Sequence, residues 1–248
     1  MSDPSIGETI RSFSVWVLPV LFAIPLHEAA HGFAAWKLGD DTAYQQGRIS
    51  LNPLRHIDPF GTILLPLLLL LPQLLYGRGA FVFGYAKPVP VNFGRLRHPR
   101  RDTILVAAAG PTMNIALAVI SAGLVHVVEY LPTVASDWTI KTLARSILLN
   151  LILAVFNMIP IPPLDGGRVA VGLLPRPLGY RLAKLEPRGM LILLILLIGL
   201  PVLGQTIGVD LNILPRLLEP PIDFLFNAIV GLVGLSNDAV QNLQDALG

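Results

Sequence analysis

The chain has 248 residues, of which 53% are hydrophobic and only 14% are charged, and its formal net charge is +2. Soluble domains carry about 25% charged residues, so this composition indicates an integral membrane protein in a lipid bilayer. Apart from Arg145, the basic residues lie outside the apolar runs and form no continuous patch, which excludes a nucleic-acid-binding protein. The absence of cysteine excludes disulfides and thiolate ligands, so any metal must be bound by His, Asp or Glu.

Six apolar runs alternate with more polar segments. They cover residues 13–36, 60–76, 103–131, 143–164, 189–209 and 222–235. A helix needs about 20 apolar residues to cross a bilayer, and the first, third and fourth runs can do so. We therefore expect an all-α polytopic membrane protein with three core transmembrane helices, a re-entrant segment, a short edge strand and one or two further C-terminal helices. The last run could span the bilayer or lie at its interface.

The domain organisation is expected to be simple. The sequence shows no internal repeat and no linker that would separate a second domain, so residues 1–248 should form one membrane-embedded unit. Its core would cover residues 13–168, followed by C-terminal helices within 189–235.

The first apolar run contains the pentapeptide His27-Glu28-Ala29-Ala30-His31. Positions i and i+4 share one face of a helix, so both imidazoles can bind one metal ion. Glu28 can then act as the base on a zinc-activated water. The alternative is that the histidines only satisfy each other or a nearby carbonyl, but ionisable groups inside a membrane are costly and usually functional.

The second run and the segment after it have unusual composition. Pro66 and Pro72 interrupt residues 60–76, which favours a re-entrant element over a straight helix. Residues 80–92 are rich in aromatic and β-branched side chains and end in prolines, which predicts a short edge strand. Such an edge could hold an extended substrate by strand addition; the alternative is an interfacial loop.

Asp165 is the candidate for a third metal ligand. A catalytic zinc site uses three protein ligands and keeps a fourth position open. Asp165 ends a long apolar run at a point where three prolines must interrupt the helix, so its carboxylate could turn into the bundle. The alternative is an aspartate that faces headgroups and pairs with Arg168. The lack of a better third ligand favours metal binding.

Membrane depth provides a separate test of this set. Ligands of one metal share a depth, so the helices that carry the histidines and Asp165 must run in the same direction. Two helices run in the same direction only if the chain crosses the membrane an odd number of times between them. The run 103–131 supplies one such crossing, so 60–76 must enter the membrane and return to the side from which it came. Basic residues concentrate in 37–101 and 166–188, which places both segments in the cytoplasm and the N-terminus outside.

At this point the chain resembles the site-2 protease family of intramembrane zinc metalloproteases. The resemblance covers about the first two thirds of the chain and rests on five motifs. These are His27-Glu28-Ala29-Ala30-His31, Asn52-Pro53-Leu54-Arg55-His56-Ile57-Asp58-Pro59, Gly84-Tyr85-Ala86-Lys87-Pro88-Val89-Pro90-Val91-Asn92, Gly110-Pro111-Thr112-Met113-Asn114 and Asn157 through Gly167.

The resemblance implies one Zn²⁺ per chain, bound by His27, His31 and Asp165, with Glu28 as catalytic base and Asn157 helping to position substrate. It implies a zinc metalloendopeptidase that cleaves a transmembrane protein or a membrane-retained peptide. A minimal core form without PDZ or CBS domains is expected, in a bacterial inner membrane with the active site toward the cytoplasm.

Three polar side chains are weaker candidates. Asn114 could line the substrate cavity or pack span against span. Tyr85 could contact substrate from the edge strand, and His56 could stand near the metal or lie at the interface.

Two other classes compete with this interpretation. Prenyl-protein proteases use a glutamate as third ligand, but neither Glu129 nor Glu186 has a suitable setting. A non-proteolytic membrane metal-binding or transport protein is the second alternative. Transporters commonly show inverted repeats and paired broken helices, which this sequence lacks.

Overall fold

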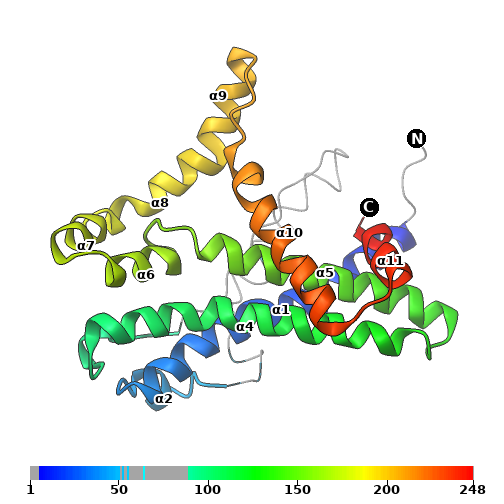
Figure 1. Ribbon diagram of the computed structural model, residues 1–248, viewed down its shortest axis with the longest axis horizontal. Helices are drawn as coiled ribbons and strands as arrows, with labels where there is room; N and C mark the ends of the chain where they lie inside the picture. Colours follow the sequence, from blue (N-terminus) through cyan, green and yellow to red (C-terminus); the bar gives the residue numbers. More distant parts are fainter. Residues whose placement is uncertain (1–5, 51, 53–54, 56–63, 65–88, 248) are drawn as a thin grey trace.

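The computed structural model describes residues 6–50, 52, 55, 64 and 89–247, and its regular structure in this part of the chain is helical, with no β-strand. Three long helices form the centre: α1 (Ile6–Lys37), α4 (Pro99–Val128) and α5 (Thr133–Asn157). α1 and α5 run in the same direction and α4 runs against them (Figure 1). The predicted three-helix core and the parallel pair that the metal site needs are both confirmed.

The ends of the core helices follow from local chemistry. α4 begins with Pro99 at its first turn, and the His98 amide donates to the Asp102 carboxylate at 2.8 Å. α5 ends at Asn157, before the prolines at 160, 162 and 163. α5 begins ten residues before the apolar run 143–164. The run starts later because charged side chains in the first turns of α5 lower the hydropathy there, although they do not break the helix. The Lys141 ammonium and Arg11 guanidinium both pair with Asp137 there.

Shorter helices follow the core. α6 (Asp165–Leu173) and α7 (Arg176–Ala183) lead into α8 (Glu186–Leu194), which continues through a π-helical stretch, η4 (Ile195–Gly199), into α9 (Leu200–Ile207). Together residues 186–207 form a fourth helix long and apolar enough to cross a membrane, whereas the sequence predicted a C-terminal helix here without counting it as a span. It stands away from the core in Figure 1.

Two further helices close the described chain. The run 222–235 is the second half of α10 (Ile213–Val233), which is not among the four helices with the length and apolarity of a span. α11 (Asn237–Leu247) was not predicted, because it is amphipathic rather than apolar and buries only Leu243 and Ala246. α2 (Thr42–Gln45) and the short 3₁₀ helix η3 (Phe93–Arg95) flank the gap in the described residues.

The re-entrant segment and the edge strand stay predictions. Residues 60–76, apart from Leu64, and residues 80–88 with Tyr85 lie outside the described part of the chain, as does His56. The described remainder of the second segment, residues 89–92, is neither helix nor strand.

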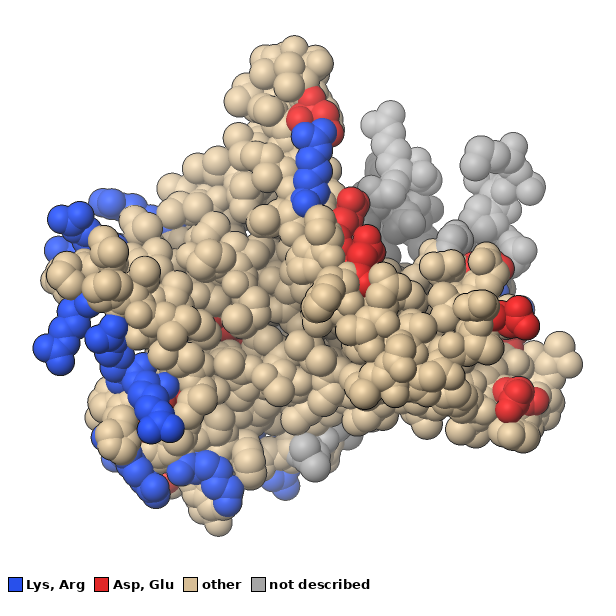
Figure 2. All heavy atoms as spheres, viewed as in Figure 1, with Lys and Arg blue, Asp and Glu red and all other residues tan. Residues whose placement is uncertain are grey.

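Basic side chains gather at one end of the molecule. Figure 2 shows Lys and Arg over the region where α4 begins and α6 and α7 lie, while Asp and Glu are more frequent elsewhere on this face. The cytoplasmic placement of segments 37–101 and 166–188 stays a prediction.

Candidate metal centre

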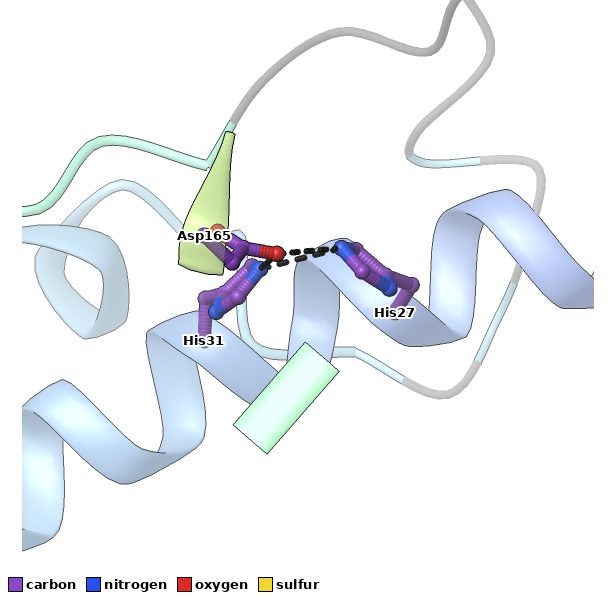
Figure 3. Close-up of side chains that lie close together, drawn as sticks. All are labelled: His27, His31 and Asp165. Carbon is purple, nitrogen blue, oxygen red and sulfur yellow. Dashed lines mark hydrogen bonds and ion pairs between the residues drawn. The ribbon is translucent and has the colours of Figure 1, made fainter. Parts of the chain in front are cut away.

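Three predicted ligands from separate parts of the chain meet at one point. His27 and His31 project from α1 toward Asp165, the first residue of α6 (Figure 3). The two Nε2 atoms are 3.1 Å apart, and the Asp165 Oδ2 atom lies 3.2 Å from one and 3.3 Å from the other. His27 and Asp165 are each only 7% exposed. The structure thus brings together all three side chains that the sequence singled out as metal ligands.

Hydrogen bonds to the far ring nitrogens determine how these imidazoles face the centre. The His27 Nδ1–H donates to the Asn114 Oδ1 at 2.5 Å, and the His31 Nδ1–H donates to the Val106 carbonyl at 2.7 Å. A neutral imidazole has one N–H, so both Nε2 atoms present lone pairs to the centre. Asp165 Oδ2 is buried and has no hydrogen-bond partner among the described residues. Three electron-pair donors therefore face one another, and a cation would relieve their repulsion.

The size of this triangle suits zinc. Tetrahedral zinc with ligand distances near 2.0–2.1 Å has ligand atoms about 3.3 Å apart. The three distances observed here agree with that value. Two imidazoles and one carboxylate are also a known donor set of catalytic zinc sites, which leave the fourth position for water or substrate.

Gly110 of α4 makes room for this centre. A Cβ atom built on Gly110 would lie 2.5 Å from the His31 Nε2 and 2.6 Å from the His27 Nε2. Real Cβ atoms do not approach other heavy atoms this closely, so any side chain would displace the two imidazoles. The glycine of the Gly110-Pro111 motif is thus explained by the space that the two imidazoles need.

The turn before α6 aims Asp165 at the histidines. A Cβ on Gly166 would meet the Met158 carbonyl oxygen at 2.2 Å, and one on Gly167 would meet the Pro162 nitrogen at 2.3 Å. The two glycines after Asp165 therefore let α6 pack directly on the turn that follows α5.

The alternative partner of Asp165 is engaged elsewhere. The Arg168 guanidinium lies 3.5 Å from the Glu186 carboxylate and over the ring of Phe93. The alternative of an Asp165–Arg168 pair at the headgroups does not occur in the structure.

Asn114 belongs to a buried polar chain behind the centre. It is completely buried, and its Nδ2 donates to the Asn150 Oδ1 at 2.8 Å and to the Ala23 carbonyl at 3.2 Å. The Asn150 Nδ2 in turn donates to the Ser146 carbonyl at 2.9 Å. These contacts favour orientation of His27 over direct substrate contact for Asn114. Sequence reasoning missed Asn150, although an amide within an apolar run was a visible signal.

Glu28 follows His27 on α1 and lies outside the group of three side chains that could hold a metal ion. It is half-buried, and its Oε2 accepts a hydrogen bond from the Val89 backbone N–H at 3.0 Å. Asn157, the other predicted substrate contact in the described chain, is half-buried at the end of α5. It donates from its amide to the Leu153 carbonyl at 3.0 Å.

Comparison with known proteins gives a consistent result. The model of peptidase family M50 matches residues 121–197. YwhC of Bacillus subtilis (strain 168), named as a zinc metalloprotease, is 37% identical over 187 residues, which cover 73% of this chain and 79% of that protein. Rip2 of Mycolicibacterium smegmatis, also named as a zinc metalloprotease, is 33% identical over 200 residues, or 77% of this chain and 72% of Rip2. No solved structure matches the chain.

Proposed function

The chain belongs to peptidase family M50 and is a membrane zinc metalloprotease, and we propose that it cleaves membrane-spanning substrates within the bilayer as a protease of the site-2 type. In this proposal His27, His31 and Asp165 hold the zinc ion and Glu28 is the catalytic base. The observation that carries it is the convergence of three electron-pair donors, with no hydrogen-bond donor among them, at a buried point between long apolar helices.

The chemistry divides between the cofactor and the chain. Zinc, when bound, polarises a peptide carbonyl and lowers the pKa of a water molecule. Glu28 takes a proton from the attacking water as the oxygen bonds to the carbonyl carbon, and returns it to the amide nitrogen as the C–N bond breaks. The hydrogen bonds from His27 to Asn114 and from His31 to Val106 keep both imidazoles in the tautomer that this work requires.

Substrate is proposed to enter as an extended chain. A transmembrane substrate has its amides in helical hydrogen bonds, so it must be unwound near Glu28 before hydrolysis. Residues 80–92, with Tyr85, are proposed as the edge that holds it, and Asn157 as a further contact. We propose that the centre faces the cytoplasm, which the basic end of the molecule supports, and that the membrane is a bacterial inner membrane, which the bacterial relatives support.

The test of the base is Glu28→Gln in protein reconstituted into phosphatidylethanolamine–phosphatidylglycerol vesicles with a tagged single-span membrane protein. General acid–base catalysis contributes about 10²–10⁴-fold, so cleavage should fall by that factor while the zinc content stays at one per chain. Unchanged cleavage would remove Glu28 from the mechanism.

Metal analysis tests the ligands separately. His27→Ala, His31→Ala and Asp165→Ala should each lose zinc, whereas Asn157→Ala should keep it. If the wild-type protein binds zinc through these three residues but cleaves no membrane protein offered to it, a non-proteolytic metal-binding protein becomes the better description.

A further inference from the structure

We propose that residues 89–97, here called the strap, position the base through the backbone N–H of Val89, and that Gly32 is required for this contact. The inference rests on the proposed function, in which Glu28 is the base. It assigns roles to Val89 and Gly32 as positioning residues, neither of which contacts the reacting atoms.

The first contact joins the strap to the base itself. The Val89 N–H donates to the Glu28 Oε2 at 3.0 Å. Proline has no N–H, so Val89, between Pro88 and Pro90, is the only residue of that tripeptide able to donate. One oxygen of the carboxylate is thereby held in place, and the other is left for proton transfer.

The second contact lies one helical turn along α1. Gly32 shares a face of the helix with Glu28, and a Cβ built on it would lie 2.6 Å from the Val89 Cγ1 and 3.2 Å from the Ala43 Cβ. Val89 is 8% exposed, so its side chain fills the space that Gly32 leaves. The absence of a side chain at position 32 lets the Val89 backbone come close enough to reach Glu28.

The other end of the strap is fixed to the end of the same helix. The Asn92 N–H donates to the Oδ2 of the fully buried Asp40 at 2.6 Å, and the Arg97 N–H donates to the Leu38 carbonyl at 3.0 Å. The Arg95 guanidinium pairs with Asp41 at 2.8 Å. The strap is therefore anchored on α1 and the turn after it at several points, so the Val89 N–H is held in a defined place.

A fixed donor matters because catalysis depends on sub-ångström placement. A displacement of about 1 Å can reduce a rate by about 100-fold. A glutamate side chain has several rotatable bonds, and a hydrogen bond from a rigid backbone selects one arrangement of its carboxylate. If the strap only covered apolar surface, substitutions in it would change the rate according to the volume of the side chain. Loss of the Val89 N–H would then have no effect of its own.

Disulfide formation tests the geometry without reference to activity. The natural chain has no cysteine, so Gly32→Cys with Val89→Cys gives a single pair. The two Cβ atoms should lie within about 4 Å, which suits a disulfide. We expect rapid oxidation of this pair. Gly123→Cys with Val89→Cys is the control. A Cβ on Gly123 meets nothing within 4 Å, so this pair should form no intramolecular disulfide. Equal yields from both pairs would overturn the contact.

Kinetics with a rescue variant test the role. Gly32→Ala pushes Val89 away, so kcat should fall about 10- to 100-fold with zinc content and KM little changed. In the double variant with Gly32→Ala and Val89→Ala, the Val89 Cγ1 that the new Cβ at position 32 would meet is gone. The kcat of the double variant should therefore equal that of Val89→Ala alone. Val89→Pro removes the N–H and should lose kcat as Gly32→Ala does.

Two outcomes separate the strap from the proposed function. If Val89→Pro has the same kcat as Val89→Ala, the N–H does not position the base and the proposal is wrong. If Glu28→Gln is fully active while the disulfide between positions 32 and 89 still forms, the strap exists but the proposed base fails.

Discussion

The two ends of the α4–α5 pair are built on opposite principles. At the end near α10 and α11 the contact is an apolar cluster of small and branched side chains, including Ala118, Ala122, Ile147, Leu151 and Leu243. At the metal end α4 presents Gly110 and Asn114 to α1, and Asn150 of α5 accepts a hydrogen bond from Asn114. The amide atoms of Asn114 and Asn150 there make hydrogen bonds to specific partners at defined distances.

This difference predicts how each end tolerates change. Apolar packing depends on the volume of the side chains and on how closely the helices approach, and helices in a membrane can shift slightly to restore it. The hydrogen-bonded chain that orients His27 cannot shift without moving this imidazole, which we propose as a zinc ligand. Substitutions at the metal end should therefore change zinc binding more than stability, and substitutions at the apolar end should do the reverse.

The largest effect on the centre is expected from Gly110→Ala. The new Cβ would overlap the Nε2 atoms of both histidines, and the resulting strain of about 3 kcal/mol should lower zinc affinity about 100-fold. Zinc affinity can be measured by competition with a chelator on purified protein. Gly123→Ala on the same helix is the matched control and should bind zinc as the wild type does. Normal affinity in Gly110→Ala would mean that the two imidazoles do not use the space beside this glycine.

The next effect should come from the polar chain behind His27. Asn114→Ala leaves the His27 Nδ1–H without its acceptor, so the ring can change tautomer, and zinc affinity should fall about 10- to 100-fold. Asn150→Ala acts one bond further away and should have a smaller effect on the same measurement. Both variants should keep their helical circular dichroism. An equal loss from the two, or a larger loss from Asn150→Ala, would contradict orientation through Asn114.

Much of this arrangement was predictable because it depends on local patterns. The spacing of His27 and His31 places both on one helix face whatever surrounds them, and prolines must end a helix before Asp165. The depth argument then required parallel helices, and α1 and α5 are parallel.

The parts that sequence reasoning missed depend on backbone atoms or on distant pairs. The Val106 carbonyl and the Val89 N–H have no residue-specific signal, because every residue but proline carries both groups. Asn114 was identified, but its contact with His27 joins residues 87 positions apart and was not inferred. The start of α5 was predicted ten residues too late because Asp137 and Lys141 lower the hydropathy of its first turns, although an ion pair joins these two side chains in the helix.

Replacement of Asp40 should change zinc binding less than the variants above, and its main effect should be on the free energy of unfolding. Burial alone would raise the pKa of this carboxyl, but hydrogen bonds from the Thr42 hydroxyl and from the Asn92 and Thr42 amides lower it below its ordinary value of 3.8. A lowered folded-state pKa stabilises the protein above pH 3.8, and this contribution is lost as the pH falls through the folded-state value. Asp40→Asn should lower the free energy of unfolding by about 1.5–3 kcal/mol at pH 7.

The pH dependence distinguishes the charge of Asp40 from its packing. Unfolding in detergent micelles, followed from pH 7 to pH 3, should show the gap between wild type and Asp40→Asn narrowing at the acid end. A gap that stays constant over this range would mean that the carboxylate charge contributes nothing. Zinc should stay bound at pH 7 in both proteins, since Asp40 acts on the strap and not on the ligands.

The smallest effect on the centre is expected from Leu243→Ala at the apolar end. Leu243 is 1% exposed in the cluster between α11 and α5, so the cavity should lower the free energy of unfolding by about 2–5 kcal/mol. Zinc affinity should stay within about twofold of the wild type, because mutations at distant sites without shared partners act independently. Detergent unfolding and chelator competition on the same preparation measure both quantities. A parallel loss of zinc would show that the two ends of the α4–α5 pair are coupled, and that the apolar cluster helps to hold the helices at the spacing the metal centre needs.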